Sequence, residues 1–290
     1  MKTGNLSLLL ILAAGVLCAQ TGKVRIIAFG AHPDDCDSQV GGTGAKWAAM
    51  GHLVKFVAVT NGDAGHQSQG GGALAKRRRA EAIESGKRLG IAEYEVLDNH
   101  DGELLPTLAV RGQIIRRIRQ WQADIVLGPR PNDYHPDHRY TGVLLQDAAY
   151  MVVVPNICPD TPPLRKNPLF LYYQDHFQRP NPFRPDIAVS IDDTWDKKVL
   201  GLDSHVSQFY KWMPWVEGNL TEVPQGPEER RKWLAAARGG RMTPAVRAAL
   251  EKWYGADKAR SIQHAEAFEV CEYGRRPSDQ DIRQLFPMLK

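Results

Sequence analysis

Two short segments of the chain carry histidines and aspartates at spacings that suit metal chemistry. Residues 31–35 read AHPDD and residues 134–138 read YHPDH. Each segment follows an apolar run, so its carboxylates lie near buried chain, where mutual repulsion and desolvation raise their energy. A bound cation removes this penalty because its charge dominates the local field. Turns at strand ends often contain Asp and His without a metal, but two such segments with complementary ligand types favour a metal site.

The residues predicted to hold the metal are His32, Asp35 and His138. Two imidazoles and one carboxylate suit a catalytic Zn²⁺, which takes three protein ligands and leaves a position for water. Fe²⁺ and Co²⁺ also accept this donor set. We therefore predict one metal ion per chain, with zinc as the first choice.

Three more residues of the same segments are predicted to carry out the chemistry. Asp34 is expected to act as the general base on the metal-activated water. His135 is expected to face the substrate carbonyl as a cation, where it stabilises the oxyanion or protonates the leaving group. Asp137 is expected to hold His135 in the required tautomer and to raise its pKa.

The elements that position these residues alternate along the first half of the chain. Apolar runs typical of buried strands occur at residues 23–31, 53–60, 94–98 and 123–130. Runs with helical periodicity occur at residues 38–51, 72–90, 108–121 and 140–152. This rhythm predicts an α/β, Rossmann-like fold: a mostly parallel sheet with helices on both faces. Ligands of such sheets bind beyond the carboxyl ends of the strands, where both HPD segments would lie.

The second half is less regular. We predict strands at residues 169–173 and 186–191, a helix at residues 194–209 and short helical pieces after residue 211. The predicted domain therefore covers residues 20–210, and residues 211–290 form a C-terminal helical appendage packed on it.

Residues 1–19 have the layout of a signal peptide. Lys2 precedes an uncharged apolar run that is too short to span a bilayer comfortably, and small residues follow. The expected location is therefore secreted or periplasmic, with no stable membrane span after cleavage. Three cysteines remain in the mature chain, and the sequence leaves open whether Cys158 and Cys271 pair or stay free. The formal charge of +4, spread over scattered arginines, argues against a nucleic-acid partner. A homo-oligomer is left open.

Taken together, the motifs resemble the LmbE-like, or PIG-L, family of zinc-dependent de-N-acetylases over about residues 25–210. The matching segments are AHPDD, TNGDAG at 60–65, Arg78-x-x-Glu81, DGEL at 101–104, HPDH at 135–138 and Lys198…His205-x-x-Gln208. The resemblance implies the same metal and catalytic residues, and it adds Arg78 and Asp101 as residues that hold sugar hydroxyls. Cys36 departs from the family pattern, and we expect it to pack as a small apolar group.

The resemblance implies a hydrolase that removes an N-acetyl or other N-acyl group from an N-acetylglucosamine-type sugar or conjugate, through zinc-activated water. The expected partner is a small-molecule amino sugar. Two alternatives stay open: an amidase that acts on a thiol–sugar conjugate or another small amide, and a non-catalytic sugar-binding protein. The glycine-rich segments at 41–44 and 69–72 fit neither a P-loop nor a dinucleotide site.

Overall fold

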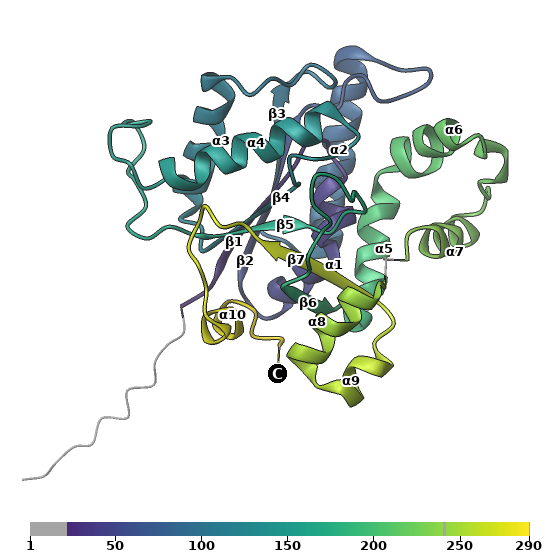
Figure 1. The fold of residues 1–290 in the computed structure, drawn as a ribbon. Helices are drawn as coiled ribbons and strands as arrows, with labels where there is room; N and C mark the ends of the chain where they lie inside the picture. Colours follow the sequence, from purple (N-terminus) through teal and green to yellow (C-terminus); the bar gives the residue numbers. More distant parts are fainter. Residues whose placement is uncertain (1–21, 240–241, 290) are drawn as a thin grey trace, which may run out of the picture.

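The structure is a computed structural model that describes residues 22–239 and 242–289 (Figure 1). The predicted signal peptide at residues 1–19 lies outside the described residues. Among the helices of the described part, none has the length and apolar character needed to cross a membrane.

The described residues form a seven-stranded sheet with the strand order β3-β2-β1-β4-β5-β7-β6. Its strands are β1 Arg25–Gly30, β2 Leu53–Thr60, β3 Glu93–Asn99, β4 Ile125–Gly128, β5 Leu169–Tyr173, β6 Ile187–Ser190 and β7 Ala265–Val270. Strands β1 to β5 run parallel to one another, and β7 runs antiparallel to both β5 and β6. This arrangement confirms the predicted mostly parallel α/β sheet.

Helices cover both faces of the sheet, because the central strands are apolar on both sides. In β1, Ile26 and Ala28 belong to one buried cluster, while Ile27 and Phe29 belong to another on the opposite face. The first cluster lies under α1 (Asp35–Ala49), α5 (Trp195–Ser204) and α10 (Asp279–Leu285), with α2 (Gly71–Leu89) beside α5. The second lies under α3 (Leu108–Trp121) and α4 (Pro136–Met151), which pack on each other (Figure 1).

The C-terminal part contributes helices, as predicted, and also a strand that the sequence analysis missed. The helices are α6 Met213–Glu217, α7 Pro227–Ala237, α8 Pro244–Tyr254, α9 Ala256–Ser261 and α10. The strand is β7, which lies between β5 and β6 inside the sheet. Its buried Glu266 accepts hydrogen bonds from the backbone of Gly42 and Thr43 in α1 and pairs with Lys198 at 2.7 Å. Residues 265–270 are therefore part of the central sheet and not of an appendage.

The helix predicted over residues 194–209 is interrupted. Helix α5 ends at Ser204, and His205 turns its fully buried ring toward Asp37, with Nε2 3.2 Å from Oδ2. A π-helix (η2, Gln208–Trp212) follows and runs into α6. Single π-helical turns are frequent at functional sites.

The cysteines of the described chain are free thiols, so Cys158 and Cys271 are not paired. Cys36 is fully buried against β1, with its Sγ 3.4 Å from the carbonyl oxygen of Ala28. This position confirms the expectation that Cys36 packs in the core.

Candidate active site

The two HPD segments lie side by side because their strands are neighbours. Strand β1 pairs with β4 in parallel, so the chain leaves both strands at the same edge of the sheet. The first segment then enters α1 and the second enters α4. Pro136 occupies the first turn of α4, and the His135 ring caps that helix by accepting the backbone N–H of Asp137 at 3.2 Å.

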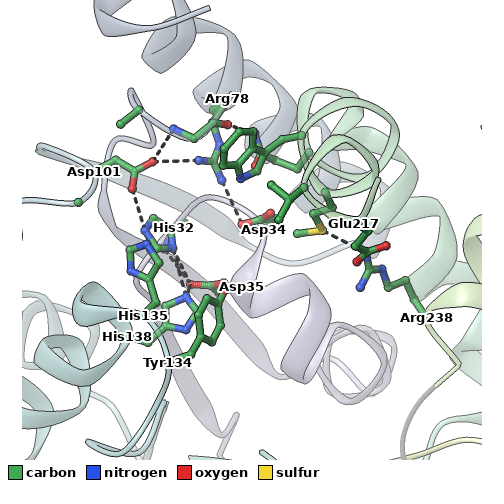
Figure 2. Close-up of a pocket in the computed structure, with 17 residues that line it drawn as sticks. His32, Asp34, Asp35, Arg78, Asp101, Tyr134, His135, His138, Glu217 and Arg238 are labelled. Carbon is green, nitrogen blue, oxygen red and sulfur yellow. Dashed lines mark hydrogen bonds and ion pairs between the residues drawn. The ribbon is translucent and has the colours of Figure 1, made fainter. Parts of the chain in front are cut away.

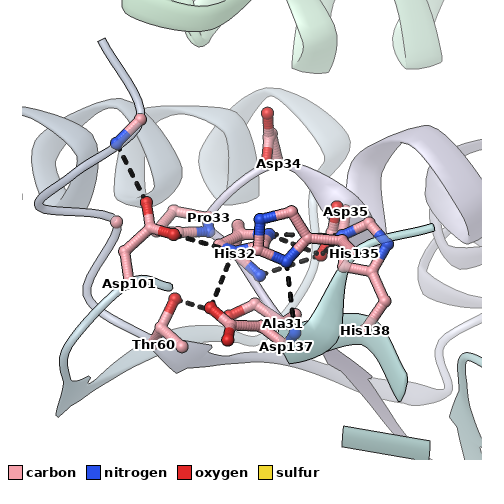
Figure 3. Close-up of polar contacts among 12 residues, drawn as sticks. Ala31, His32, Pro33, Asp34, Asp35, Thr60, Asp101, His135, Asp137 and His138 are labelled. Atoms are coloured by element: carbon pink, nitrogen blue, oxygen red, sulfur yellow. Dashed lines mark hydrogen bonds and ion pairs between the residues drawn. The ribbon is translucent and has the colours of Figure 1, made fainter. Parts of the chain in front are cut away.

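The three predicted metal ligands converge on one point (Figure 3). His32 Nδ1 lies 3.2 Å from His138 Nε2, and Asp35 Oδ2 lies 3.6 Å and 3.4 Å from these two nitrogens. Bonds of about 2.0–2.1 Å at tetrahedral angles place two zinc ligands about 3.3 Å apart. The donor types and their spacing therefore fit a zinc ion, and His135 adds a third ring nitrogen within 4.8 Å of those of His32 and His138.

Each predicted histidine ligand has its outer nitrogen held by a carboxylate. His32 Nε2 lies 3.0 Å from Asp101 and 3.2 Å from Asp137, and His138 Nδ1 lies 3.0 Å from Asp133. These contacts place the ring protons on the outer nitrogens and leave the inner nitrogens free to bind a metal. Asp133 was not singled out by the sequence analysis, although it stands only five residues before His138.

The electrostatics of the cluster favour positive charge. Burial alone lowers the pKa of His32 and of His138, but the surrounding carboxylates outweigh it and raise both pKa values above the usual range. Burial opposes ionisation of Asp35, yet His138 and His32 hold its pKa well below the usual value. A site that stabilises protonated histidines in this way also attracts a metal cation.

Asp137 contacts the ring of His135 through its backbone N–H, which fixes the tautomer of that ring, and not through its carboxylate, so the predicted rise in the pKa of His135 is wrong. The Asp137 carboxylate is fully buried, faces His32 and accepts the backbone N–H groups of Gly102 at 2.7 Å and Leu104 at 3.3 Å. Burial, together with the charges of His32 and His138, lowers the pKa of His135 instead of raising it. The reason is geometric: in the first turn of α4, Asp137 points back toward the end of β1. A role of Asp137 in catalysis stays a prediction, and its carboxylate would act by orienting the ring of His32.

Asp34 has a strained backbone and a perturbed carboxyl group. Its φ of 142° is unfavourable for any residue other than glycine. The backbone N–H donates to the hydroxyl of Tyr94 at 3.2 Å, and Oδ1 lies 3.2 Å from Nη2 of Arg78. Burial raises the pKa of Asp34 to about 6, although Arg78 opposes this shift. A carboxyl group with this pKa can exchange a proton near neutral pH, as a general base must.

Arg78 and Asp101, the predicted sugar-binding residues, both line the pocket but are heavily engaged within the protein. Arg78 is buried and donates to Asp34, to Asp101 and to the carbonyl oxygens of Pro33 and Gly62. Asp101 accepts from Arg78 and from the backbone of Gly65 and contacts His32. Their contacts hold Asp34 and His32 in place, and their contact with a substrate stays a prediction.

A pocket of about 570 Å³ opens above the cluster (Figure 2). His32, Asp34 and Asp35 lie at its polar end, with Tyr134 and His135 beside them. The other wall comes from the segment 208–217 and from Arg238, none of which the sequence analysis singled out except Gln208. The volume lies within the roughly 300–1,000 Å³ typical of small-molecule sites.

Comparisons with known proteins place the chain among de-N-acetylases. The family model described as PIG-L, GlcNAc-PI de-N-acetylase, matches residues 27–149. A diacetylchitobiose deacetylase of Thermococcus kodakarensis is 32% identical over 202 residues, which cover 66% of this chain and 73% of that protein. A mycothiol S-conjugate amidase of Streptomyces coelicolor is 28% identical over 189 residues, which cover 55% of this chain and 64% of that protein.

Among solved structures, the N,N′-diacetylchitobiose deacetylase of Pyrococcus horikoshii, complexed with its inhibitor MPG, superimposes with a TM-score of 0.63. Its sequence identity is 26%, and the match covers 86% of this chain and 84% of that chain. The matched region includes most of the C-terminal part, beyond the residues that the family model covers.

Proposed function

The chain belongs to the PIG-L family of de-N-acetylases, and from this premise we propose that it hydrolyses the N-acyl bond of an N-acetylglucosamine-type sugar or conjugate. The acyl group is most simply acetyl. The observation that carries the proposal is the convergence of His32, Asp35 and His138, with the buried Asp34 beside them. Amide hydrolysis needs this combination of a cation site and a separate base.

In this proposal His32, Asp35 and His138 hold one Zn²⁺, with Fe²⁺ or Co²⁺ as substitutes. A divalent ion bound there would polarise the amide carbonyl and lower the pKa of water. Asp137, Asp101 and Asp133 keep the histidine rings in the ligating tautomer.

Two side chains of the protein carry out the proton transfer and stabilise the oxyanion. Asp34 takes the proton of the attacking water, since its pKa of about 6 leaves it mostly ionised at neutral pH. His135 accepts the N–H of Asp137 at Nδ1, so its Nε2 carries the ring proton and can donate a hydrogen bond. Because its pKa is lowered, it acts as a neutral donor to the developing oxyanion and not as the cation first expected.

A screen for released acetate tests the proposal. The zinc-loaded chain is incubated with N-acetylglucosamine and with its neutral and phosphorylated conjugates, and acetate and free amine are quantified. We expect equal amounts of acetate and amine from at least one sugar. Metal-loaded, folded protein that releases neither from any of them would contradict the proposal and would favour a non-catalytic sugar-binding protein.

The amidase alternative keeps the same site and differs in the substrate. It is favoured by the similarity to the mycothiol S-conjugate amidase named above, although the chain covers only 64% of that protein. If the chain hydrolyses a thiol–sugar amide and does not hydrolyse any N-acetyl sugar, the amidase alternative is correct.

We also propose that the chain is exported and acts in the periplasm or outside the cell. The support is the apolar run after Lys2, which has the length and flanks of a cleaved signal. N-terminal sequencing of the protein from its native host tests this point. We expect a mature chain that begins near Gln20, and a chain that retains Met1 in the cytoplasm would contradict it.

A further inference from the structure

The pocket wall across from the histidines is one face of a short helical segment. Gln208, Trp212, Met213, Val216 and Glu217 all line the pocket, and their spacing is that of successive helical turns. The π-helix and α6 that carry them lie beyond residues 27–149, the part that the family model matches. This wall is therefore a feature of the C-terminal part of this chain.

Trp212 brings an aromatic ring close to the polar network. A Cβ atom placed on Gly65 would lie 3.3 Å from Asp101 Oδ2 and 3.7 Å from the indole nitrogen of Trp212. The ring is held by stacking on Trp215, with centroids 5.3 Å apart and planes 18° apart. Among the described residues, none accepts a hydrogen bond from the indole N–H of Trp212, so this donor is available to a ligand in the pocket.

The wall is apolar and partly open to solvent. Val216 is 60% exposed, and Trp215, which stacks on Trp212, is 51% exposed. Trp215 does not line the pocket, but Trp212, Met213 and Val216 do, and they present a surface that an apolar or ring-shaped group would cover. Transfer of this apolar surface from water to contact with a ligand lowers the free energy, so the surface favours ligand binding.

The charged side chains of the pocket indicate that the ligand group lying on this apolar wall is uncharged. In the described lining, the arginines are Arg78 and Arg238. Arg78 is paired with Asp34 and Asp101, and Arg238 is paired with Glu217 at 3.3 Å (Figure 2). A phosphate beside this wall would therefore find no uncommitted arginine, and it would face the carboxylate of Glu217.

A pyranose ring meets all of these conditions. Its C–H face stacks on an indole, and its hydroxyl groups accept from the indole N–H of Trp212 and donate to Glu217. We propose that Trp212, Met213 and Val216 form a second subsite, which binds an uncharged sugar ring joined to the amino sugar whose N-acyl group is cleaved. This inference rests on the proposed function and narrows its substrate to neutral di- or oligosaccharides, not phosphorylated conjugates.

The first test compares kcat/KM for N-acetylglucosamine, N,N′-diacetylchitobiose and N-acetylglucosamine 1-phosphate. We expect the wild-type chain to prefer the disaccharide to both others. Trp212→Ala should lower kcat/KM for the disaccharide about tenfold, mainly through KM, and leave the monosaccharide within about twofold. Trp212→Phe, which keeps a ring, should restore most of the loss. Tyr150→Ala, which removes an exposed aromatic ring from α4 outside the pocket, is the matched control and should change neither value.

A second variant tests the charge argument without disturbing the packing. Val216 is exposed, so Val216→Lys should fold, and it adds an unpaired cation to the wall. We expect kcat/KM for the phosphorylated sugar to rise about threefold or more relative to the disaccharide. An unchanged ratio, or a Trp212→Ala variant that loses the same factor on monosaccharide and disaccharide, would overturn the subsite.

A binding measurement separates the failure of the subsite from the failure of the proposed function. Tryptophan fluorescence of the Asp34→Asn chain is titrated with N,N′-diacetylchitobiose, so that turnover does not interfere. We expect a saturable change that Trp212→Ala, in the same background, removes. If no sugar is hydrolysed by the wild-type chain, the proposed function fails, and this titration still decides the subsite. A saturable change that persists unaltered without Trp212 would contradict the inference.

Discussion

The two walls of the pocket are built on opposite principles. The edge formed after β1 and β4 is a dense polar network in which His32, Asp34 and His138 are each fixed by a second side chain. The wall at residues 208–217 is apolar, partly exposed and stabilised by ring stacking. The first wall holds groups at defined distances for a reaction, and the second offers a surface on which different rings can lie. Substitutions in the first should therefore change rates on every substrate, and those in the second should change substrate preference.

The largest effect is expected at Asp34. Asp34→Asn keeps the volume and the contact with Arg78 but removes the base, so kcat should fall by about 10²–10⁴ on every sugar. The metal content should stay unchanged, because Asp34 is not a predicted ligand. Acetate release and elemental analysis on the same preparation check both points. If Asp34→Asn keeps the wild-type rate, Asp34 is not the general base.

A smaller effect is expected from the outer layer of the polar edge. Asp133 holds the outer nitrogen of His138, so Asp133→Ala should weaken metal binding about 10–100-fold. Titration with a competing chelator measures this change. Asp147→Ala, which removes a half-exposed carboxylate from α4, is the control and should leave metal affinity unchanged. Equal affinities in all three proteins would show that the ring of His138 needs no such support.

The smallest effect at this edge is expected from Tyr94. Its hydroxyl accepts the N–H of the strained Asp34 and donates to Asp37 at 2.8 Å. Tyr94→Phe should lower kcat about tenfold, with KM and metal content unchanged, because the base loses its backbone anchor. Tyr210→Phe removes a comparable buried hydrogen bond, to Asp203, and serves as the control. If both variants lose the same activity, Tyr94 contributes to stability and not to the position of Asp34.

The contrast between the two walls also explains how much the sequence could predict. The polar edge was accessible because two HPD segments follow strands that parallel topology makes neighbours, which brings His32 and His138 together. Arg78 and Asp101 came only from the family resemblance, and in the structure Arg78 contacts Asp34 and Asp101 contacts His32. The strands and helices of the first half could be predicted because the apolar periodicity within each segment was enough to identify them.

What the sequence could not predict depends on contacts between distant segments. The carboxylate of Asp137 contacts His32, in the segment that follows β1, and not a side chain of its own segment, so local reasoning assigned it to His135. Strand β7 has the short, mixed sequence AEAFEV, and only its place between β5 and β6 makes it a strand. The break at His205 follows from the buried Asp37, more than 160 residues away, and the wall around Trp212 follows from that break.

The most direct test of the central claim, that both HPD segments share one metal ion, is the metal content of the wild-type chain and of His138→Ala. Both are purified and dialysed in the same zinc-containing buffer and analysed after removal of free metal. We expect about one ion per folded wild-type chain and less than about a tenth of that in the variant, which retains its fold by circular dichroism. Equal metal content in the two proteins, or none in the wild-type chain, would contradict the account.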